Sequence, residues 1–208
     1  MQNNFDTWES FFYEGTDVLV NIPGIRNKEE LAKYEAEHSL VNIAKIYSDG
    51  TTFSCDTDGY KKIHKAIFGD IYPWAGEFRK VDIGKGITEF CPHKEIEQCL
   101  SDKLFEIECS PEFYHRADNM AYYYAEICCI HPFREGNGRT QRVFFRSLLR
   151  EHGLMCDFGA WSKAANNIAC EEAYRLNYKP LQELFQKSLQ KFDGKNFEAL
   201  YSEPQMTR

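Results

Sequence analysis

The sequence predicts a mainly α-helical protein with one small β-hairpin. Two observations support this prediction. Apolar residues recur at steps of three and four along most of the 208-residue chain, which is the period of one helix face. Short β-prone pieces cluster in a single stretch around closely spaced glycines. A chain of this length can bury one sizeable core, so a single domain is expected.

The N-terminal part is expected to hold two helices. Residues 10–25 include the pair Pro23-Gly24 and are predicted to be irregular. Asn27 is followed by Lys and two Glu residues, the pattern of an N-cap with an acidic first turn, so a helix is expected from there to about Tyr47. A second helix is expected over residues 59–68, where a glycine and a proline follow.

The hairpin is expected in the middle of the chain. Two β-prone pieces, residues 78–81 and 87–90, flank Gly84-Lys85-Gly86, which is predicted to be the turn. Pro92 ends the hairpin. Further helices are expected over residues 95–107, 117–128, 143–151, 162–173 and 180–190.

Composition excludes several classes of protein. The net charge of −7 argues against a nonspecific nucleic-acid binder, which needs a basic surface. The N-terminus lacks the basic and apolar regions of a signal peptide, and no apolar run reaches the roughly 18 residues of a membrane span. We therefore expect a cytoplasmic protein. The eight cysteines form no C-x-x-C pair and are expected to be reduced, small buried side chains rather than a zinc site.

Residues 131–142, His-Pro-Phe-Arg-Glu-Gly-Asn-Gly-Arg-Thr-Gln-Arg, are termed the motif segment and carry the strongest functional signal. Gly136-Asn137-Gly138 is expected to open a helix, where backbone N–H groups without helical partners bind anions. The glycines let the backbone approach a phosphate closely. A plain turn with an Asn N-cap is the alternative. Phe133 is expected to point inward and anchor the segment.

The charged residues of the motif segment favour the phosphate interpretation. Arg139 and Arg142 fall in the first helical turn, where cations oppose the helix dipole at a cost of a few tenths of a kcal/mol each. Two guanidiniums there are explained if they clamp a polyphosphate. Glu135 would repel phosphates unless a divalent cation lay between them, which indicates Mg²⁺. An acidic residue that complements the helix dipole is the alternative.

His131 is the candidate general base. A histidine side chain has an unperturbed pKa near ~6.5, which suits proton transfer at neutral pH. The alternative is a histidine that caps the preceding helix or packs its ring.

The motif segment matches the signature H-x-F-x-(D/E)-G-N-G-R-x-x-R, and the sequence resembles Fic-domain proteins. Residues 67–79 are similar to the stretch that leads into the family's flap hairpin, and residues 13–19 to the start of bacterial cell-filamentation-type members. The likeness covers roughly residues 10–190. It implies the Fic fold, a helical bundle with a small hairpin flap beside the active site. One domain over residues 1–208 would comprise a helical extension (about 1–50), a core (about 55–190) and a tail (191–208).

The resemblance implies a protein adenylyltransferase, a nucleotidyltransferase that moves AMP from ATP to a hydroxyl of a target protein and releases diphosphate. His131 would be the base, and Glu135 would hold Mg²⁺. The phosphate-binding residues would be Gly136, Asn137 (also through its side chain), Gly138, Arg139 and Arg142, with Arg142 on the γ-phosphate. The exposed edge of the flap would pair with the target's backbone. The flap residues are Lys85, Gly86, Ile87, Thr88, Glu89 and Phe90. A surface hairpin without a partner is the alternative, and an adenine pocket is expected near Asn177-Tyr178.

Two family comparisons sharpen these expectations. Doc-type relatives, which transfer phosphate, have a lysine where this chain has Gly138, so the open space favours AMP transfer. Many members also carry an inhibitory helix with the pattern (S/T)-x-x-x-E-(G/N). The nearest stretch here, residues 188–194, has Phe192 in place of the glutamate. This suggests either no inhibition or a separate small antitoxin chain. A toxin of that type resembles modifiers of bacterial type II topoisomerases, so a topoisomerase subunit is one candidate target.

Two other functions stay open at this point. The chain could be a nucleotide-binding or interaction module without turnover, although simple ATP binding does not require a base at His131. It could also be a Fic enzyme that transfers another phosphate-linked group, such as phosphate, UMP or phosphocholine.

Overall fold

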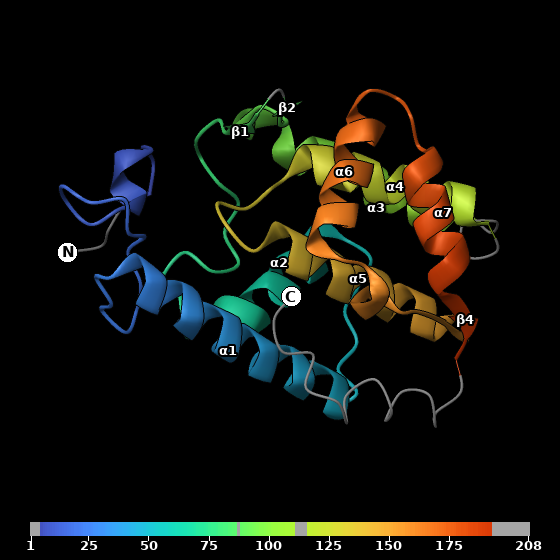
Figure 1. The fold of residues 1–208 in the computed structure, drawn as a ribbon, viewed down its shortest axis with the longest axis horizontal. Coiled ribbons are helices and arrows are strands. Elements are labelled where there is room, and N and C mark those ends of the chain that lie inside the picture. Colours follow the sequence, from blue (N-terminus) through green and yellow to red (C-terminus); the bar gives the residue numbers. More distant parts are fainter. Residues whose placement is uncertain (1–4, 87, 111–115, 193–208) are drawn as a thin grey trace.

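A computed structural model describes residues 5–86, 88–110 and 116–192, and these residues are mainly α-helical (Figure 1). The α-helices are α1 (Lys28–Ser48), α2 (Thr57–Phe68), α3 (Ile96–Cys109), α4 (Ala117–Ile130), α5 (Asn137–Glu151), α6 (Lys163–Tyr174) and α7 (Lys179–Ser188). The strands are β1 (Gly84–Lys85), β2 (Thr88–Glu89), β3 (Leu154–Cys156) and β4 (Leu189–Lys191). Short 3₁₀ turns are η1 (Glu9–Phe11), η2 (His93–Glu95) and η4 (Phe158–Ala160). The predicted fold class is confirmed.

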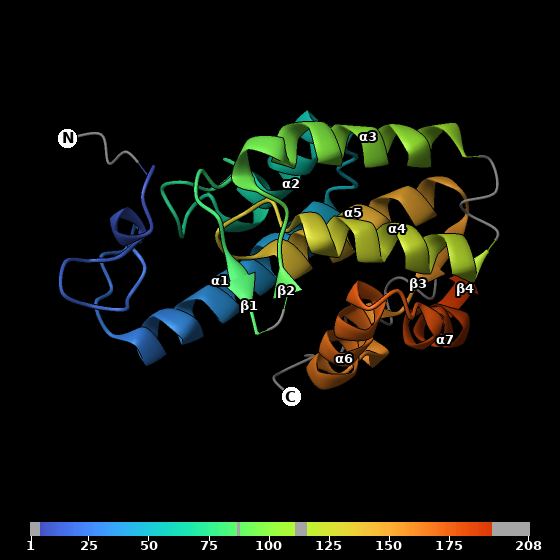
Figure 2. The ribbon, with the colours of Figure 1, turned by 90° about the horizontal axis from the view of Figure 1, so that it is seen from above.

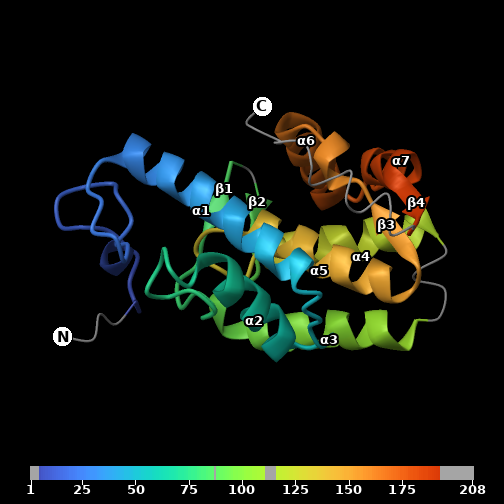
Figure 3. The same ribbon diagram turned by 90° about the horizontal axis from the view of Figure 1, so that it is seen from below.

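Helices α4 and α5 form the centre of the bundle. Helix α4 packs against α3, α5, α6 and α7, while α5 packs against α2. Helix α1 lies along α2 on the outside (Figure 3). The β1–β2 hairpin lies beside the C-terminal end of α4 and the start of α3 (Figure 2). The link between α4 and α5 is the first half of the motif segment, so both central helices position it. Within the described ranges, no helix combines the length and the apolar character needed to cross a bilayer.

Capping residues set the starts of the helices. The Asn27 side chain accepts the Glu30 N–H at 3.0 Å, so α1 begins where the N-cap pattern predicted. Asp56 accepts the Gly59 N–H at 2.7 Å, and this hydrogen bond lowers the pKa of the Asp56 carboxyl. Because of that cap, α2 begins two residues earlier than expected.

The predicted strand boundaries of the hairpin are wrong. Gly84 and Lys85, expected in the turn, form β1 and pair antiparallel with Glu89 and Thr88. Residues 78–81 form no strand. The Arg79 N–H donates to the Pro132 carbonyl at 2.9 Å, so this piece bonds to the motif segment instead of to the other arm of the hairpin.

A second small sheet was not expected. Strands β3 and β4 pair antiparallel, with Met155 opposite Gln190. The last helix therefore ends at Ser188, two residues before the predicted end. Three-residue strands show no usable alternation, and their pairing joins segments far apart in the sequence.

Arg79 is a buried cation that ties the hairpin segment to the end of α4. Its side chain has no exposed surface and donates to four backbone carbonyls. These bonds reach His131 (2.9 Å), Val81 (2.8 Å), Cys91 (2.5 Å) and Ile130 (3.2 Å). The Ile130 and His131 carbonyls lie at the C-terminal end of α4, where the helix dipole favours a cation. Burial lowers the pKa of Arg79, but a guanidinium keeps its charge in proteins.

His64 on α2 fastens the motif segment from the other side. The Gly76 N–H donates to His64 Nδ1 at 2.9 Å, so the ring proton lies on Nε2, which donates to the Glu135 carbonyl at 3.0 Å. The ring stacks on Phe133 with 3.8 Å between centroids. Burial lowers the pKa of His64 from 6.5 to about 3. The buried ring is therefore neutral and holds the carbonyl of Glu135 in place.

The depressed pKa of His64 predicts a pH-dependent stability. In the unfolded chain the ring takes up a proton below about pH 6.5, whereas the folded protein resists protonation down to about pH 3. The contribution of neutral His64 to the free energy of unfolding is therefore complete above pH 6.5. It falls as the pH drops below that value, by at most about 1.4 kcal/mol per pH unit. His64→Gln should flatten this slope in denaturant titrations between pH 6.5 and 5, and should cost about 1–3 kcal/mol at pH 7.

His38→Gln is the matched control, because His38 on α1 has a side chain that is 41% exposed and a ring that faces Asp70 at 3.4 Å. That variant should keep the steep decline of the wild type. Parallel curves for wild type and His64→Gln would contradict the assignment of a neutral buried ring.

Candidate active site

His131 ends α4 in a strained backbone conformation. Its φ of 48° and ψ of 60° lie in the left-handed region, which non-glycine residues adopt rarely. Nδ1 lies 3.3 Å from the Cys128 carbonyl, which can only accept, so the ring proton belongs on Nδ1 and the Nε2 lone pair is left for a base. The ring stacks on Phe90 of the hairpin at 3.9 Å and 16°. Both contacts fix the direction in which Nε2 points.

Phe133 and Asn137 lock the loop that follows. Phe133 is fully buried, as predicted. Its N–H donates to Asn137 Oδ1 and its carbonyl accepts from Asn137 Nδ2, both at 2.8 Å. Both polar atoms of the Asn137 side chain are thus hydrogen-bonded to the backbone of Phe133. The phosphate contact expected of Asn137 stays a prediction, and the backbone N–H is the group left for it.

The start of α5 has the geometry of an anion site. Gly136 is the N-cap with a φ of 80°, and the Thr140 N–H is the first to bond back along the helix, to the Gly136 carbonyl at 3.0 Å. The N–H groups of Asn137, Gly138 and Arg139 therefore have no helical carbonyl to bond. A Cβ on Gly136 would lie 2.3 Å from the Phe68 ring. Only glycine fits there, for conformation and for space.

Arg139 is not a free cation. Its Nη2 lies 2.6 Å from Glu35 Oε1, and its Nη1 donates to Ser39 Oγ at 3.0 Å. Both partners are on α1, and the guanidinium also covers the Phe68 ring at 4.7 Å. Sequence reasoning missed Glu35, because a carboxylate in an amphipathic helix is normally a solvated residue.

Arg142 differs from Arg139 in its surroundings. Among the residues that the structure describes, no carboxylate forms an ion pair with it. It lies beside the buried Tyr124, whose pKa is raised by burial while Arg142 opposes the shift. A Cβ on Gly138 would come 3.2 Å from Arg142 Nη1. Within the described part of the chain, Arg142 is thus a cation without a carboxylate partner, in the same first turns of α5 as the free N–H groups.

Glu135 presents a half-exposed carboxylate at the same place. Its side chain is 44% exposed, Oε1 accepts the Gly136 N–H at 3.0 Å, and Arg139 Nη2 lies 3.8 Å away. Mg²⁺ in nucleotide sites is held by one or two carboxylates together with phosphate oxygens and water. A single accessible carboxylate beside an anion site fits that pattern.

The predicted flap residues lie along the hairpin. Lys85, Gly86 and Glu89 are exposed, and Thr88 is partly exposed, while Ile87 lies outside the described residues. Phe90 is the member that contacts the motif segment, through its stacking on His131. The hairpin and the candidate base are therefore brought together as predicted.

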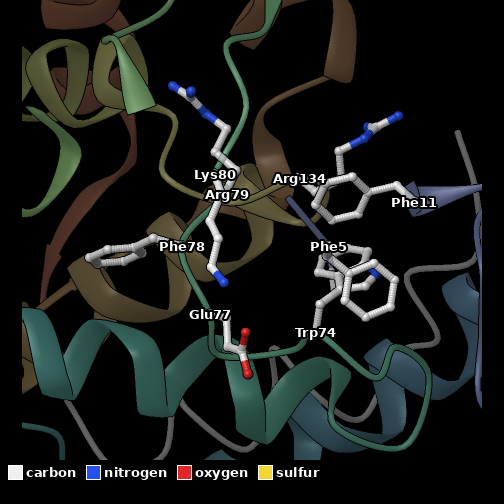
Figure 4. A pocket seen from close by; sticks show the side chains of 8 residues that line it. All are labelled: Phe5, Phe11, Trp74, Glu77, Phe78, Arg79, Lys80 and Arg134. Carbon is white, nitrogen blue, oxygen red and sulfur yellow. The ribbon is translucent and has the colours of Figure 1, made fainter. Parts of the chain in front are cut away.

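Arg134 packs against the N-terminal segment. Its guanidinium stacks over Trp8 at 4.2 Å and lines a small pocket on the N-terminal side of the motif segment (Figure 4). The pocket is lined by Phe5, Phe11, Trp74, Glu77, Phe78, Arg79, Lys80 and Arg134. It contains none of the predicted phosphate-binding residues. The pocket therefore lies where Phe5 and Phe11 of the N-terminal segment approach Arg134 of the motif segment.

Other predicted features have structural roles. Asn177 donates to Glu172 Oε2 at 2.8 Å and Tyr178 packs against Tyr122, so the adenine pocket stays a prediction. In the stretch compared with the inhibitory helix, Ser188 ends α7 and residues 189–191 form β4, while residues 193 and 194 lie outside the described ranges. All eight cysteines are free thiols. Ligand atoms of Cys91, Glu95 and Cys99 lie within 4.8 Å of one another, but burial raises the pKa of the Cys91 thiol to about 12.

The geometry agrees with comparisons to known proteins. The profile of the Fic/DOC family matches residues 54–149. "Protein adenylyltransferase VbhT" of Bartonella schoenbuchensis is 33% identical over 85% of this chain, which spans 38% of that protein's length. "Probable protein adenylyltransferase y4lH" of Sinorhizobium fredii is 36% identical, with 70% of this chain and 77% of that protein covered.

A solved structure shows the same fold. BepC of Bartonella tribocorum, a VirB-translocated effector crystallised with AMPPNP, superposes with a TM-score of 0.79 at 21% identity. The match covers 89% of this chain and 98% of the crystallised BepC chain. With the motif segment placed as described and these relatives aligned over most of its length, the chain belongs to the Fic/DOC family.

Proposed function

We propose that this chain is a protein adenylyltransferase, which transfers AMP from ATP to a hydroxyl side chain of a target protein. The observation that carries the proposal is that the motif segment joins a candidate base to a candidate phosphate-binding helix start. At one end lies His131, whose Nδ1 faces the Cys128 carbonyl and leaves Nε2 for a base; at the other lies a helix start with free N–H groups and Arg142, which has no carboxylate partner among the described residues. Relatives named protein adenylyltransferases, at 33% and 36% identity, support it.

The residues can perform this transfer in one displacement. The target's hydroxyl oxygen forms a bond to the α-phosphorus while its proton passes to His131 Nε2. The bond from the α-phosphorus to the bridging oxygen breaks, and diphosphate leaves. The N–H groups at the start of α5 and the Arg142 guanidinium stabilise the charge on the phosphates and align them, which is most of catalysis in such reactions.

Glu135 would hold Mg²⁺ against the phosphates of the co-substrate ATP. When bound, the ion would offset phosphate charge that Arg142 and the helix start balance only in part. Arg139 and Gly138 would line the same phosphates.

The hairpin would bind the target. In this proposal the flap residues Lys85, Gly86, Ile87, Thr88, Glu89 and Phe90 pair with an extended backbone of the target and bring its hydroxyl to His131. The stacking of Phe90 on His131 supports this arrangement. A type II topoisomerase subunit is the candidate target that the family resemblance implies.

Further proposals concern the biological setting. Arg142 has no carboxylate partner among the described residues, which supports inhibition by a separate antitoxin chain and a toxin-like enzyme. Eight free thiols support action in the cytoplasm. We propose that the whole chain acts as one Fic domain with an N-terminal extension (about 1–50), a core (about 55–190) and a tail (191–208).

The transfer reaction is tested by labelling a cell lysate. With α-³²P-ATP the wild type should label a protein band, and with γ-³²P-ATP it should not. His131→Ala should abolish the label while calorimetry still detects ATP, because the base is lost and the anion site is kept. His152→Ala, which removes an exposed histidine just after α5, should label normally.

Other outcomes identify the alternatives. Transfer of the γ-label would indicate a phosphotransferase. Competition of the label by UTP or a choline nucleotide would indicate another transferred group. ATP binding without any labelled protein would support a non-catalytic module.

Gly138→Ala should separate stability from nucleotide binding. Gly138 lies inside α5 without a positive φ, so alanine should stabilise the fold by about 0.4–1 kcal/mol. The added Cβ would press on Arg142 Nη1 and displace a phosphate-binding donor. The KM for ATP should therefore rise by roughly tenfold, the value of one charge-assisted hydrogen bond. An unchanged KM in a more stable variant would remove Arg142 from the phosphate site.

A further inference from the structure

Arg139 lies between two carboxylates that belong to different parts of the fold. Its Nη2 is 2.6 Å from Glu35 Oε1 on α1 and 3.8 Å from Glu135 Oε1 in the motif segment. Glu35 is 104 positions away in the sequence, whereas Glu135 and Arg139 are four apart. The guanidinium is thus held by the distant carboxylate in preference to the near one.

The residues around Glu35 stabilise its ion pair with Arg139. The Glu35 side chain is only 15% exposed, against 44% for Glu135. The Tyr72 hydroxyl donates to Glu35 Oε2, and the pKa of that phenol is raised by burial and by the Glu35 charge. The buried Ser39 accepts from Arg139 on the same side. The Tyr72 and Ser39 hydroxyls therefore hold Glu35 and Arg139 together against the face of α1.

We propose that Glu35 is a positioning residue that holds Arg139 away from Glu135, so that the Glu135 carboxylate is available to the Mg²⁺ that accompanies the nucleotide. This inference rests on the proposed function, in which Glu135 is the magnesium ligand. Glu35 itself touches neither the nucleotide nor the ion.

Competition explains why such a residue is needed. An arginine four residues after a glutamate at a helix start can form a two-pronged ion pair with it. A carboxylate occupied in that way must release the guanidinium before it can bind a cation. With Glu35 present, Arg139 already has a shorter and less exposed partner. Without it, Glu135 is the acidic group nearest to Arg139 within the described part of the chain.

Glu35→Gln tests the proposal in the full-length protein. ADP binding is measured by calorimetry over a series of Mg²⁺ concentrations. The Mg²⁺ concentration for half-maximal ADP affinity should rise about two- to fivefold, the range that one partly exposed ion pair supplies. Glu37→Gln should leave it unchanged, since Glu37 is on the same helix but is 63% exposed and faces Lys33.

A double-variant cycle shows whether Glu35 acts through Arg139. In an Arg139→Gln background, Glu35→Gln should no longer change the Mg²⁺ dependence, because the competing cation is gone. Tyr72→Phe loosens Glu35 without removing its charge and should give a smaller shift in the same direction. It also keeps the test valid if Glu35→Gln does not fold.

Two results would overturn the proposal. One is a lower melting temperature for Glu35→Gln with an unchanged Mg²⁺ dependence, which would leave Glu35 with a purely structural role. The other is an equal shift in the Arg139→Gln background. Failure of the proposed function would look different: wild type would bind ADP with Mg²⁺ and still transfer no AMP.

Discussion

The buried guanidinium of Arg79 is the interaction on which the site depends. Its side chain donates to carbonyls in three segments. These are Val81 just after Arg79, Cys91 just after β2, and Ile130 in the last turn of α4. A buried charge is costly unless its hydrogen bonds are made, and here four carbonyls, two of them at the negative end of a helix, accept from it. Removing Arg79 would leave those carbonyls buried and unpaired. The hairpin therefore cannot move independently of the end of α4.

That junction supports the strained conformation of His131. A non-glycine residue in the left-handed region costs about 1–3 kcal/mol, which the surrounding contacts must offset. Arg79 bonds the His131 carbonyl, Phe90 stacks on its ring, and the Asn137 side chain closes the loop that follows. The strain turns the chain sharply between α4 and α5. As a result, one short loop leads from His131 at the end of α4 to the first N–H groups of α5.

Local patterns in the sequence predicted the parts of this arrangement that depend on neighbours along the chain. The N-cap at Asn27 and the glycines before α5 were found because caps and turns are short-range features. Glu35, His64 and Arg79 were not found, because their roles come from partners 52 to 104 positions away. The first strand of the hairpin was predicted at residues 78–81 but lies at Gly84–Lys85 for the same reason. An apolar or β-prone piece shows what it can form, but tertiary hydrogen bonds decide its partner.

The pairing of Arg139 with Glu35 changes the electrostatics of the site. Two carboxylates, Glu35 and Glu135, and two guanidiniums, Arg139 and Arg142, are close to neutral in sum. Net attraction for a nucleotide must then come from how the charges are placed. In the proposed function, Arg142 and the α5 N–H groups would present positive charge toward the phosphates, while Glu35 confines the Arg139 guanidinium to the α1 side. Of the two carboxylates near Arg139, the half-exposed Glu135 is then the one that would be left to hold a divalent cation against those phosphates.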